Sequence, residues 1–261
     1  MKKIILFFLI FPLFLFSQDW NQIGGDIDGL AAGDWTGSTV ATNDNGNIVV
    51  IGEHHSDYYN GRVRVFQKNA NNSWIQLGQS LYGDGQGSSG YQGEQFGMKV
   101  SLNSDGTILA IAAPTHDVML GSVVLGEYVG QVKIYQLIDN VWTQIGDTIN
   151  GEVDYQVAGY GGVELNNSGN RLAISSNDKI EVYEYLQGSW TLLGNEINLV
   201  ENSGYGASIS MNGDGNKIGF IDYYATTAYI YEYLNNSWVE IANFQFYEWS
   251  NQINAKVLLI S

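Results

Sequence analysis

The three histidines of this 261-residue sequence, His54, His55 and His116, lie in polar segments that follow predicted strands. Acidic residues stand beside them at Glu53, Asp57 and Asp117. Imidazole and carboxylate groups together are ligands of divalent metal ions. The spacing matches no recognised ligand pattern, and two adjacent imidazoles do not easily point at one ion. The sequence therefore predicts polar residues of a binding surface, with no metal ion and no cofactor.

Tyrosines near the same segments could stack on the rings of a carbohydrate ligand. In a chain that is 13% aromatic, they could equally pack between repeated units. The predicted binding residues are His54, His55, Asp57, Tyr58, Tyr59, Tyr91, His116, Asp117 and Tyr155. The predicted partner is a protein or a carbohydrate.

No catalytic constellation stands out in the sequence. It has no cysteine, no nucleophile elbow and no recognisable Ser–His–Asp pattern. The glycine-rich stretch 83–97 lacks the Lys-Ser/Thr that ends a phosphate-binding loop, so we expect a flexible connector there. We expect a secreted binding or structural module that is not an enzyme. The alternatives are a glycan-active enzyme that uses paired carboxylates, and a fragment of a longer repeat protein.

The acidic composition of the chain argues against anionic partners. Asp and Glu total 27 against 11 Lys and Arg, which gives a formal net charge of −16. Phosphate binding relies on Lys and Arg, so nucleic acid and anionic membrane surfaces are poor partners. Without cysteine no disulfide can hold the fold, and stability must come from burial of the 44% of residues that are apolar.

The N-terminus predicts an export signal. Lys2 and Lys3 precede the apolar run Ile4–Phe16, and Ser17 is a small residue suited to cleavage. This run is short for a bilayer, which needs about 20 residues. We expect residues 1–17 to be removed, with no membrane insertion afterwards. The mature protein is then extracellular, at the cell surface or in the periplasm.

Two short patterns recur along the rest of the chain. In the first, a Trp is followed three residues later by Ile or Leu and usually then by Gly, starting at Trp20, Trp74, Trp142, Trp190 and Trp238. The second is a turn that begins with an Asn, at Asn43, Asn103, Asn166 and Asn212, and in a weaker copy at Asn251. Such self-similarity at roughly 40–60 residues indicates a repeat fold.

Each repeat predicts four antiparallel strands, and the apolar runs of the inner strands indicate burial on both faces. Small sheets stacked as the blades of a β-propeller meet that requirement. The predicted fold class is all-β, a propeller of about five four-stranded blades of which the fifth is incomplete. The domain 18–261 divides into units at about 33–78, 96–146, 159–194, 204–242 and 244–261, with 18–24 as an extra outer strand.

One copy carries a family resemblance. Phe96-Gly97 and Ala112-Ala113-Pro114 bound a segment that resembles the FG-GAP repeat, the blade unit of integrin-type propellers. The pattern of Trp142–Asp147 resembles the repetitive, WD40-like propellers that bacteria secrete by the type IX route. The resemblance implies a propeller over 18–261. It carries no calcium site, because Asn103-Ser-Asp-Gly106 offers one carboxylate and Ca²⁺ takes six to eight oxygens.

In a blade of this kind, tight turns gather at one end and long connections at the other. The predicted long connections are Glu53–Gly61, Gln79–Gln95, Pro114–Gly130 and Asp147–Gly159. Long loops on a rigid scaffold are where binding is usually found. All nine predicted binding residues lie in these four loops, so we expect the function at that end.

Overall fold

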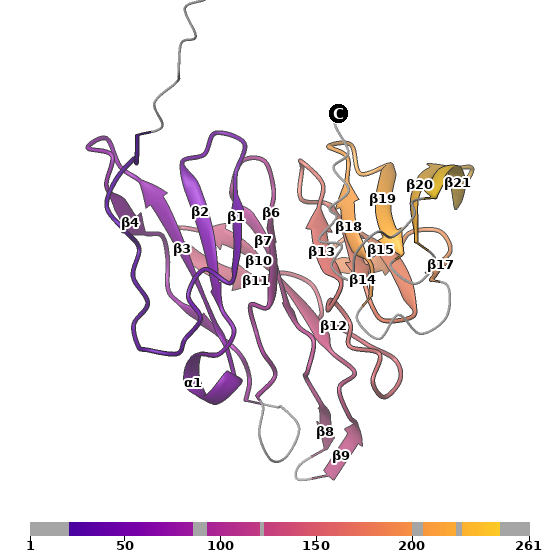
Figure 1. Ribbon diagram of the computed structural model, residues 1–261, viewed down its shortest axis with the longest axis horizontal. Coiled ribbons are helices and arrows are strands. Elements are labelled where there is room, and N and C mark those ends of the chain that lie inside the picture. Colours follow the sequence, from indigo (N-terminus) through magenta and orange to yellow (C-terminus); the bar gives the residue numbers. More distant parts are fainter. Residues whose placement is uncertain (1–20, 86–92, 121–122, 200–205, 223–225, 246–261) are drawn as a thin grey trace, which may run out of the picture.

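The computed structural model describes residues 21–85, 93–120, 123–199, 206–222 and 226–245. In this part nearly every element is a β-strand, and the strands form four large antiparallel sheets in chain order and one separate two-stranded hairpin (Figure 1). These sheets correspond to the first four predicted units, so the predicted propeller of four-stranded blades is confirmed. The signal peptide and the incomplete fifth unit beyond residue 245 lie outside the described residues.

The four blades share one strand order. Blade 1 has β1 (Thr39–Thr42), β2 (Ile48–Glu53), β3 (Arg62–Lys68) and β4 (Trp74–Gln76), with β5 (Leu81–Tyr82) also paired to β3. Blade 2 has β6 (Lys99–Leu102), β7 (Ile108–Ala113), β10 (Gln131–Ile138), β11 (Val141–Gln144) and β12 (Ile149–Asn150). Blade 3 has β13 (Gly162–Leu165), β14 (Arg171–Ser175), β15 (Lys179–Leu186), β16 (Ser189–Leu192) and β17 (Ile197–Asn198). Blade 4 has β18 (Ser208–Met211), β19 (Lys217–Asp222), β20 (Thr227–Leu234) and β21 (Ser237–Gln245).

The blades stack face to face. Their first strands, β1, β6, β13 and β18, contact one another in that order. Three apolar cores fill the spaces between successive blades, and every residue of β7 is buried, as the unbroken apolar run of that strand predicts.

The repeated Asn holds the tight turn between the first two strands of each blade. The side-chain carbonyl of Asn103 accepts hydrogen bonds from the backbone N–H groups of Thr107 and Ile108, at 2.9 and 2.8 Å. The equivalent Asn in each of the other blades accepts the hydrogen bond from the backbone N–H five residues later. Backbone bonds also join the turns of adjacent blades, as from Ser104 N–H to the Asn167 carbonyl at 3.1 Å. The turn thus closes its own hairpin and ties it to the next blade.

The Trp…Gly pattern holds the outer edges of the blades together. The Trp142 indole N–H donates to the Leu77 carbonyl of the previous blade at 2.9 Å. Gly78, the next residue, has a φ of 75°, and a Cβ there would meet the indole at 2.7 Å. The same contact recurs for Trp74, Trp190 and Trp238. Glycine therefore provides both the backbone conformation and the space for the indole.

Blade 4 departs from this pattern, and one predicted boundary is wrong there. Ala242 stands where the other outer strands have Gly, so the strand is not broken, and β21 runs on to Gln245. In the first three blades the glycine splits the outer strand, which resumes as β5, β12 or β17. Unit 4 therefore extends past 242, into residues that the sequence assigned to the fifth unit.

At the other end of the chain, residues 21–24 form no strand, in contrast to the predicted outer strand 18–24. Ile23 and Gly24 nevertheless contact Trp74 as Leu77 and Gly78 contact Trp142. They occupy the place of a preceding outer strand through this indole contact alone.

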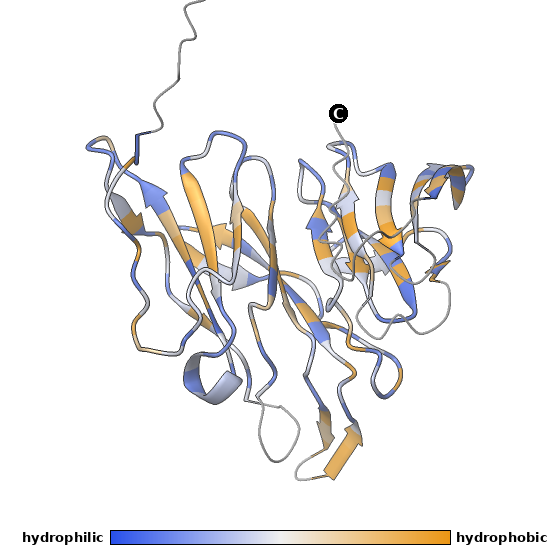
Figure 2. Cartoon of the chain, viewed as in Figure 1, coloured by the Kyte–Doolittle hydropathy of each residue, from blue (hydrophilic) through white to orange (hydrophobic). Residues whose placement is uncertain are grey.

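The long connections contain structure of their own. The loop after β2 holds a single turn, α1 (Ser56–Tyr59), in which Asp57 and Tyr58 have positive φ. The loop after β7 forms a hairpin of β8 (Val118–Leu120) and β9 (Val123–Gly126), which projects as an apolar tip (Figure 2). Among the described residues, no helix has the length and apolar character to cross a membrane.

The Trp–Gly contact is tested by Gly78→Ala. The substitution adds a Cβ at an indole and strains a positive φ, so it should lower the free energy of unfolding by about 2–4 kcal/mol. Gly188→Ala is the matched control, because Gly188 has a φ of 92° and no neighbour within 4 Å of the added carbon. It should cost about 1 kcal/mol. Equal losses in urea unfolding would contradict a role for the indole.

Candidate functional site

A tight turn, Trp35–Ser38, opens blade 1 at the long-loop end. The Ser38 N–H donates to the Trp35 carbonyl at 3.1 Å, and Gly37 has a φ of 81°. A positive φ at the third position is what a type II turn requires, which explains the glycine. The turn therefore places an exposed serine and an exposed tryptophan three residues apart on one rigid backbone segment.

A buried network of charges anchors this turn. The Thr36 hydroxyl donates to Glu53 at 2.9 Å, and the Glu53 side chain is fully buried at the end of β2. Arg62 and Arg64, on the neighbouring strand β3, both pair with the Glu53 carboxylate. Arg62 also pairs with Asp34, next to the turn, at 2.7 Å. Two carboxylates and two guanidinium groups thus compensate one another inside the blade.

Ser38 is hydrogen-bonded to a histidine. Its Oγ lies 2.8 Å from Nδ1 of His54, which follows β2 directly. Burial of His54 and the positive charges of His55 and Lys99 lower the pKa of His54 to about 4. At neutral pH the imidazole is therefore uncharged. In its Nε2–H tautomer, Nδ1 accepts a hydrogen bond from the Ser38 hydroxyl. An exposed hydroxyl next to a neutral base is the arrangement of an activated nucleophile.

Aromatic rings surround this pair. The Trp35 indole stacks on the His55 imidazole with 3.7 Å between ring centroids and 20° between planes. His55 in turn lies 4.5 Å from His54 and 4.3 Å from Tyr59. Trp35 remains 59% exposed, so the ring offers a surface to a ligand beside Ser38.

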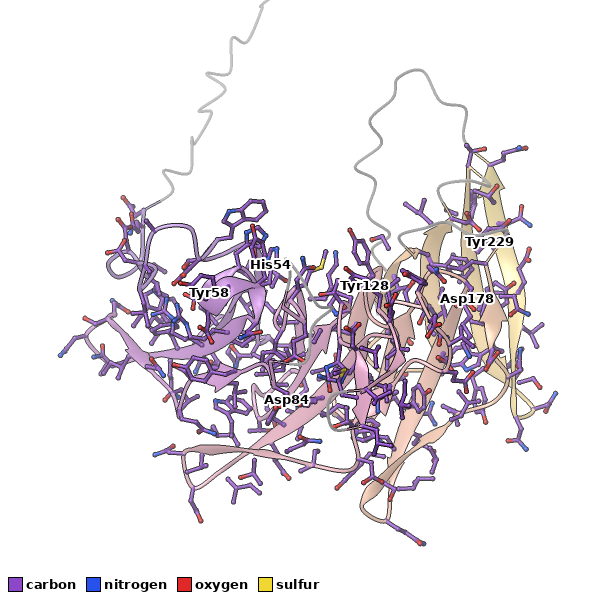
Figure 3. All side chains as sticks on the ribbon, turned by 90° about the horizontal axis from the view of Figure 1, so that it is seen from below. His54, Tyr58, Asp84, Tyr128, Asp178 and Tyr229 are labelled. Carbon is purple, nitrogen blue, oxygen red and sulfur yellow. The ribbon has the colours of Figure 1, made fainter. Side chains whose placement is uncertain are left out.

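The predicted binding residues of the first long loop are only partly brought together. His54, His55 and Tyr59 join the cluster around Ser38, as above. Tyr58 is 90% exposed, and Asp57 accepts a hydrogen bond from Asn60 at 3.3 Å. Figure 3 shows His54 and Tyr58 on the same blade, seen from the long-loop end. Tyr91 lies outside the described residues.

The other predicted residues lie in blade 2 and its connection to blade 3. His116 Nδ1 is 2.6 Å from the buried carboxylate of Glu94. Asp117 accepts the Tyr128 backbone N–H at 2.8 Å, and burial raises the pKa of its carboxyl group. The Tyr155 hydroxyl donates to Glu127 at 2.7 Å. These residues are held by partners of their own and are separate from the Ser38 cluster.

A buried polar residue followed by a residue of positive φ recurs at the start of blades 1, 2 and 3. Asp34, Glu94 and Gln156 are buried and hold equivalent places, and the residue after each has positive φ. Backbone bonds confirm the equivalence, since Gln95 N–H donates to the Tyr59 carbonyl and Val157 N–H to the Tyr128 carbonyl. The strained backbone and the buried polar residue therefore belong to the fold.

The histidine and the tryptophan of blade 1 do not recur in blades 2 and 3. The residues at the place of His54 are Pro114 in blade 2 and Asn177 in blade 3, which follow from the strand registers. The residues at the place of Trp35 are Gln95 and Val157. No pattern in the sequence pointed to Ser38 or Trp35. Aligning the copies on Asp34–Gly37, Glu94–Gly97 and Gln156–Gly159 would have shown that only one copy has an aromatic residue in the second place.

A cluster of three carboxylates in blade 3 resembles a metal site. Glu152, Glu181 and Glu196 converge, but the Lys179 ammonium group lies 3.0, 3.2 and 2.8 Å from them. Burial opposes the charge of Lys179, yet the carboxylates outweigh burial and raise its pKa. The lysine is the cation of this cluster, which therefore reads as an ion-pair network.

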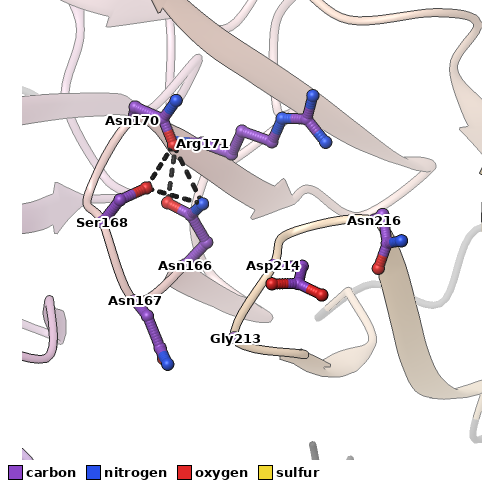
Figure 4. Close-up of a pocket in the computed structure, with 8 residues that line it drawn as sticks. All are labelled: Asn166, Asn167, Ser168, Asn170, Arg171, Gly213, Asp214 and Asn216. Atoms are coloured by element: carbon purple, nitrogen blue, oxygen red, sulfur yellow. Dashed lines mark hydrogen bonds between the residues drawn. The ribbon is translucent and has the colours of Figure 1, made fainter.

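A polar pocket of about 550 Å³ lies at the opposite end, between the tight turns of blades 3 and 4 (Figure 4). Its lining consists of Asn166, Asn167, Ser168, Asn170, Arg171, Gly213, Asp214 and Asn216. The Arg171 guanidinium group is already paired with Glu184 at 2.9 Å and bonded to the Gly215 carbonyl at 3.2 Å. The lining contains no histidine and no pair of a nucleophile and a base.

The sequence matches no family model and no curated protein. Among solved structures, the chain is similar to the periplasmic gluconolactonase of Pseudomonas aeruginosa, with a TM-score of 0.57 and 13% identity over 83% of this chain and 59% of that one. It is similar to a protein from Lactobacillus plantarum, with a TM-score of 0.54 and 13% identity over 86% and 60%. It is also similar to KlAtg21 in complex with the coiled coil of AgAtg16, with a TM-score of 0.52 and 14% identity over 80% and 57%.

The chain thus spans about 60% of the length of these structures, and likeness at such low identity shows the β-propeller fold alone. It nevertheless corrects one expectation. The missing sequence motif led to the expectation that the protein is not an enzyme. That exclusion does not hold, because an enzyme, the gluconolactonase, is among the structures that share the fold. The sequence lacked a motif, but the fold brings Ser38 and His54 together from two different strands' ends.

The anchor of the turn is tested by Glu53→Gln. The substitution leaves two buried guanidinium groups with one carboxylate fewer, so the free energy of unfolding should fall by about 3 kcal/mol. Glu232→Gln removes a partner of a half-exposed pair with Lys217 at 3.7 Å and should cost less than about 1 kcal/mol. Chemical denaturation measures both, and similar costs would show that the Glu53 network does not support blade 1.

Proposed function

We propose that the protein is a hydrolase that cleaves carboxylic esters, lactones included, with Ser38 as nucleophile and His54 as general base. The observation that carries this proposal is the 2.8 Å contact between the exposed Ser38 hydroxyl and the neutral His54 imidazole. A nucleophile and a base within hydrogen-bond reach are two of the components of covalent catalysis.

The reaction follows from the two side chains. Ser38 Oγ attacks the carbonyl carbon while its proton passes to His54 Nδ1, and the tetrahedral intermediate collapses as His54 returns that proton to the leaving alkoxide. Water, deprotonated by His54, then attacks the acyl-serine and releases the acid and free Ser38. With a lactone, the leaving hydroxyl stays on the acyl chain, so the product is a single hydroxy acid.

Surrounding charge supports the proposal. Lys99 stands at the start of β6 in blade 2, close enough for its charge to lower the pKa of His54. A positive charge beside the site favours the oxyanion that forms on the carbonyl oxygen. The same fold in a gluconolactonase shows that a propeller can carry lactone hydrolysis. We further propose that the enzyme acts outside the cytoplasm, and the export signal predicted over residues 1–17 supports this part of the proposal.

Ser38→Ala and His54→Gln test the assignment. Each should lower kcat/KM for vinyl acetate and for glucono-1,5-lactone by about 100-fold or more, because removal of nucleophile or base takes away covalent catalysis. Acid release in a pH-stat, corrected for spontaneous hydrolysis, measures the rate. Ser189→Ala, on the exposed strand β16, is the control and should retain wild-type rates. Wild-type rates in the Ser38 variant would sink the proposal.

The pH profile gives a separate test. His54 acts as a base only when neutral, so activity should be present above its pKa of about 4 and lost as pH falls through that value. The acid limb should therefore lie well below the 6.5 of an ordinary histidine. Lys99→Met removes a charge that lowers this pKa and should move the limb to higher pH. A limb near pH 6.5 that does not respond to Lys99→Met would contradict the role of His54.

A further inference from the structure

Trp35 is the exposed ring nearest in the chain to the proposed nucleophile. It begins the turn that Ser38 ends, and the hydrogen bond between them fixes the two residues relative to one another. One face of the indole stacks on His55 at 3.7 Å, and the residue stays 59% exposed. The ring is thus held from one side and open to a ligand on the remainder of its surface.

The backbone conformation of Trp35 is common to three blades and does not depend on its aromatic side chain. Its φ of 54° matches the 58° of Gln95 and the 48° of Val157 at the equivalent places in blades 2 and 3. All three blades therefore have a residue in the left-handed conformation two positions before the glycine. Of these three described blades, blade 1 alone has an aromatic side chain at this position and a Ser–His pair beside it. The coincidence of the two departures in one blade links the ring to the chemistry.

We infer that Trp35 is the platform on which the substrate's saccharide ring stacks, so that the substrate is a sugar lactone or an ester of a sugar. This inference rests on the proposed function and adds the class of substrate. An indole binds the apolar C–H face of a sugar ring, while polar groups at its edge pair with the hydroxyls.

The polar edge favours a sugar over an aromatic acyl group. His54 lies edge-on to the indole, with 5.6 Å between ring centroids, and its Nδ1 is hydrogen-bonded to the Ser38 hydroxyl. Covering such groups with an unsubstituted aromatic ring would leave them without partners, which costs binding free energy, whereas sugar hydroxyls replace the water that they lose. The ring and its edge therefore match a hydroxylated ring better than a flat hydrocarbon.

The first test compares substrates with and without a sugar ring. Trp35→Ala should lower kcat/KM for glucono-1,5-lactone at least tenfold more than it lowers kcat/KM for vinyl acetate, mainly through KM. Trp35→Phe, which keeps an aromatic face, should restore most of the preference. Tyr82→Ala removes an exposed aromatic residue on β5 and serves as the control. Equal losses on both substrates, or no loss on either, would overturn the inference.

The second test needs no turnover. Methyl β-D-glucopyranoside should bind the Ser38→Ala protein in isothermal titration calorimetry, and Trp35→Ala in that background should abolish the heat signal. A preference for p-nitrophenyl benzoate that depends on Trp35, without one for the lactone, would assign the platform to an aromatic group and overturn the inference. If Ser38→Ala retains full activity on both substrates, the proposed function fails instead, so the two failures are distinguishable.

Discussion

The contact between an indole and the glycine of the previous blade is the constraint on which the architecture depends. Each Trp donates to the carbonyl just before that glycine, and the missing side chain gives the indole its place. The glycine also breaks the outer strand, which then resumes as a short second strand at the long-loop end. One residue pair thus sets the spacing of the blades and directs the connection from each blade to the next. In blade 4, Ala242 replaces the glycine, and the outer strand continues without a break to Gln245.

That constraint decides where chemistry can arise. Tight turns bonded to one another occupy one end of the blades, and their backbone groups are committed to holding the array. The other end carries connections of variable length on a shared backbone. Blade 1 differs from its neighbours there by substitution rather than by a new fold, and a buried network around Glu53 holds the substituted turn. The site is therefore a local departure from a repeat.

The Ser38 site has several positively charged side chains nearby, although the chain as a whole is strongly acidic. The protein has a net charge of −16, yet Arg62, Arg64 and Lys99 gather near the Ser38 turn. Buried carboxylates neutralise the two arginines, while burial and the charges of His55 and Lys99 lower the pKa of His54. The His54 imidazole is therefore uncharged at neutral pH, and only the uncharged form can accept a proton from a hydroxyl.

The sequence by itself determined the fold. Alternating and continuous apolar runs, Asn-anchored turns and the Trp…Gly pattern are local signals, because each depends on backbone conformation and on which faces are buried. They located the strands of blade 2 to within two residues and the long-loop end correctly. The nine residues predicted for binding remain predictions, and three of them, His54, His55 and Tyr59, lie in the Ser38 cluster.

Only the tertiary structure decided which of these residues meet. Ser38 precedes β1 and His54 follows β2, sixteen residues apart, and the antiparallel register of those strands brings them to hydrogen-bond distance. No spacing motif encodes such a pair, because the loop between two strands can vary in length without changing which ends are adjacent. The lowered pKa of His54 likewise depends on burial and on a lysine from another blade, which are properties of the packed fold.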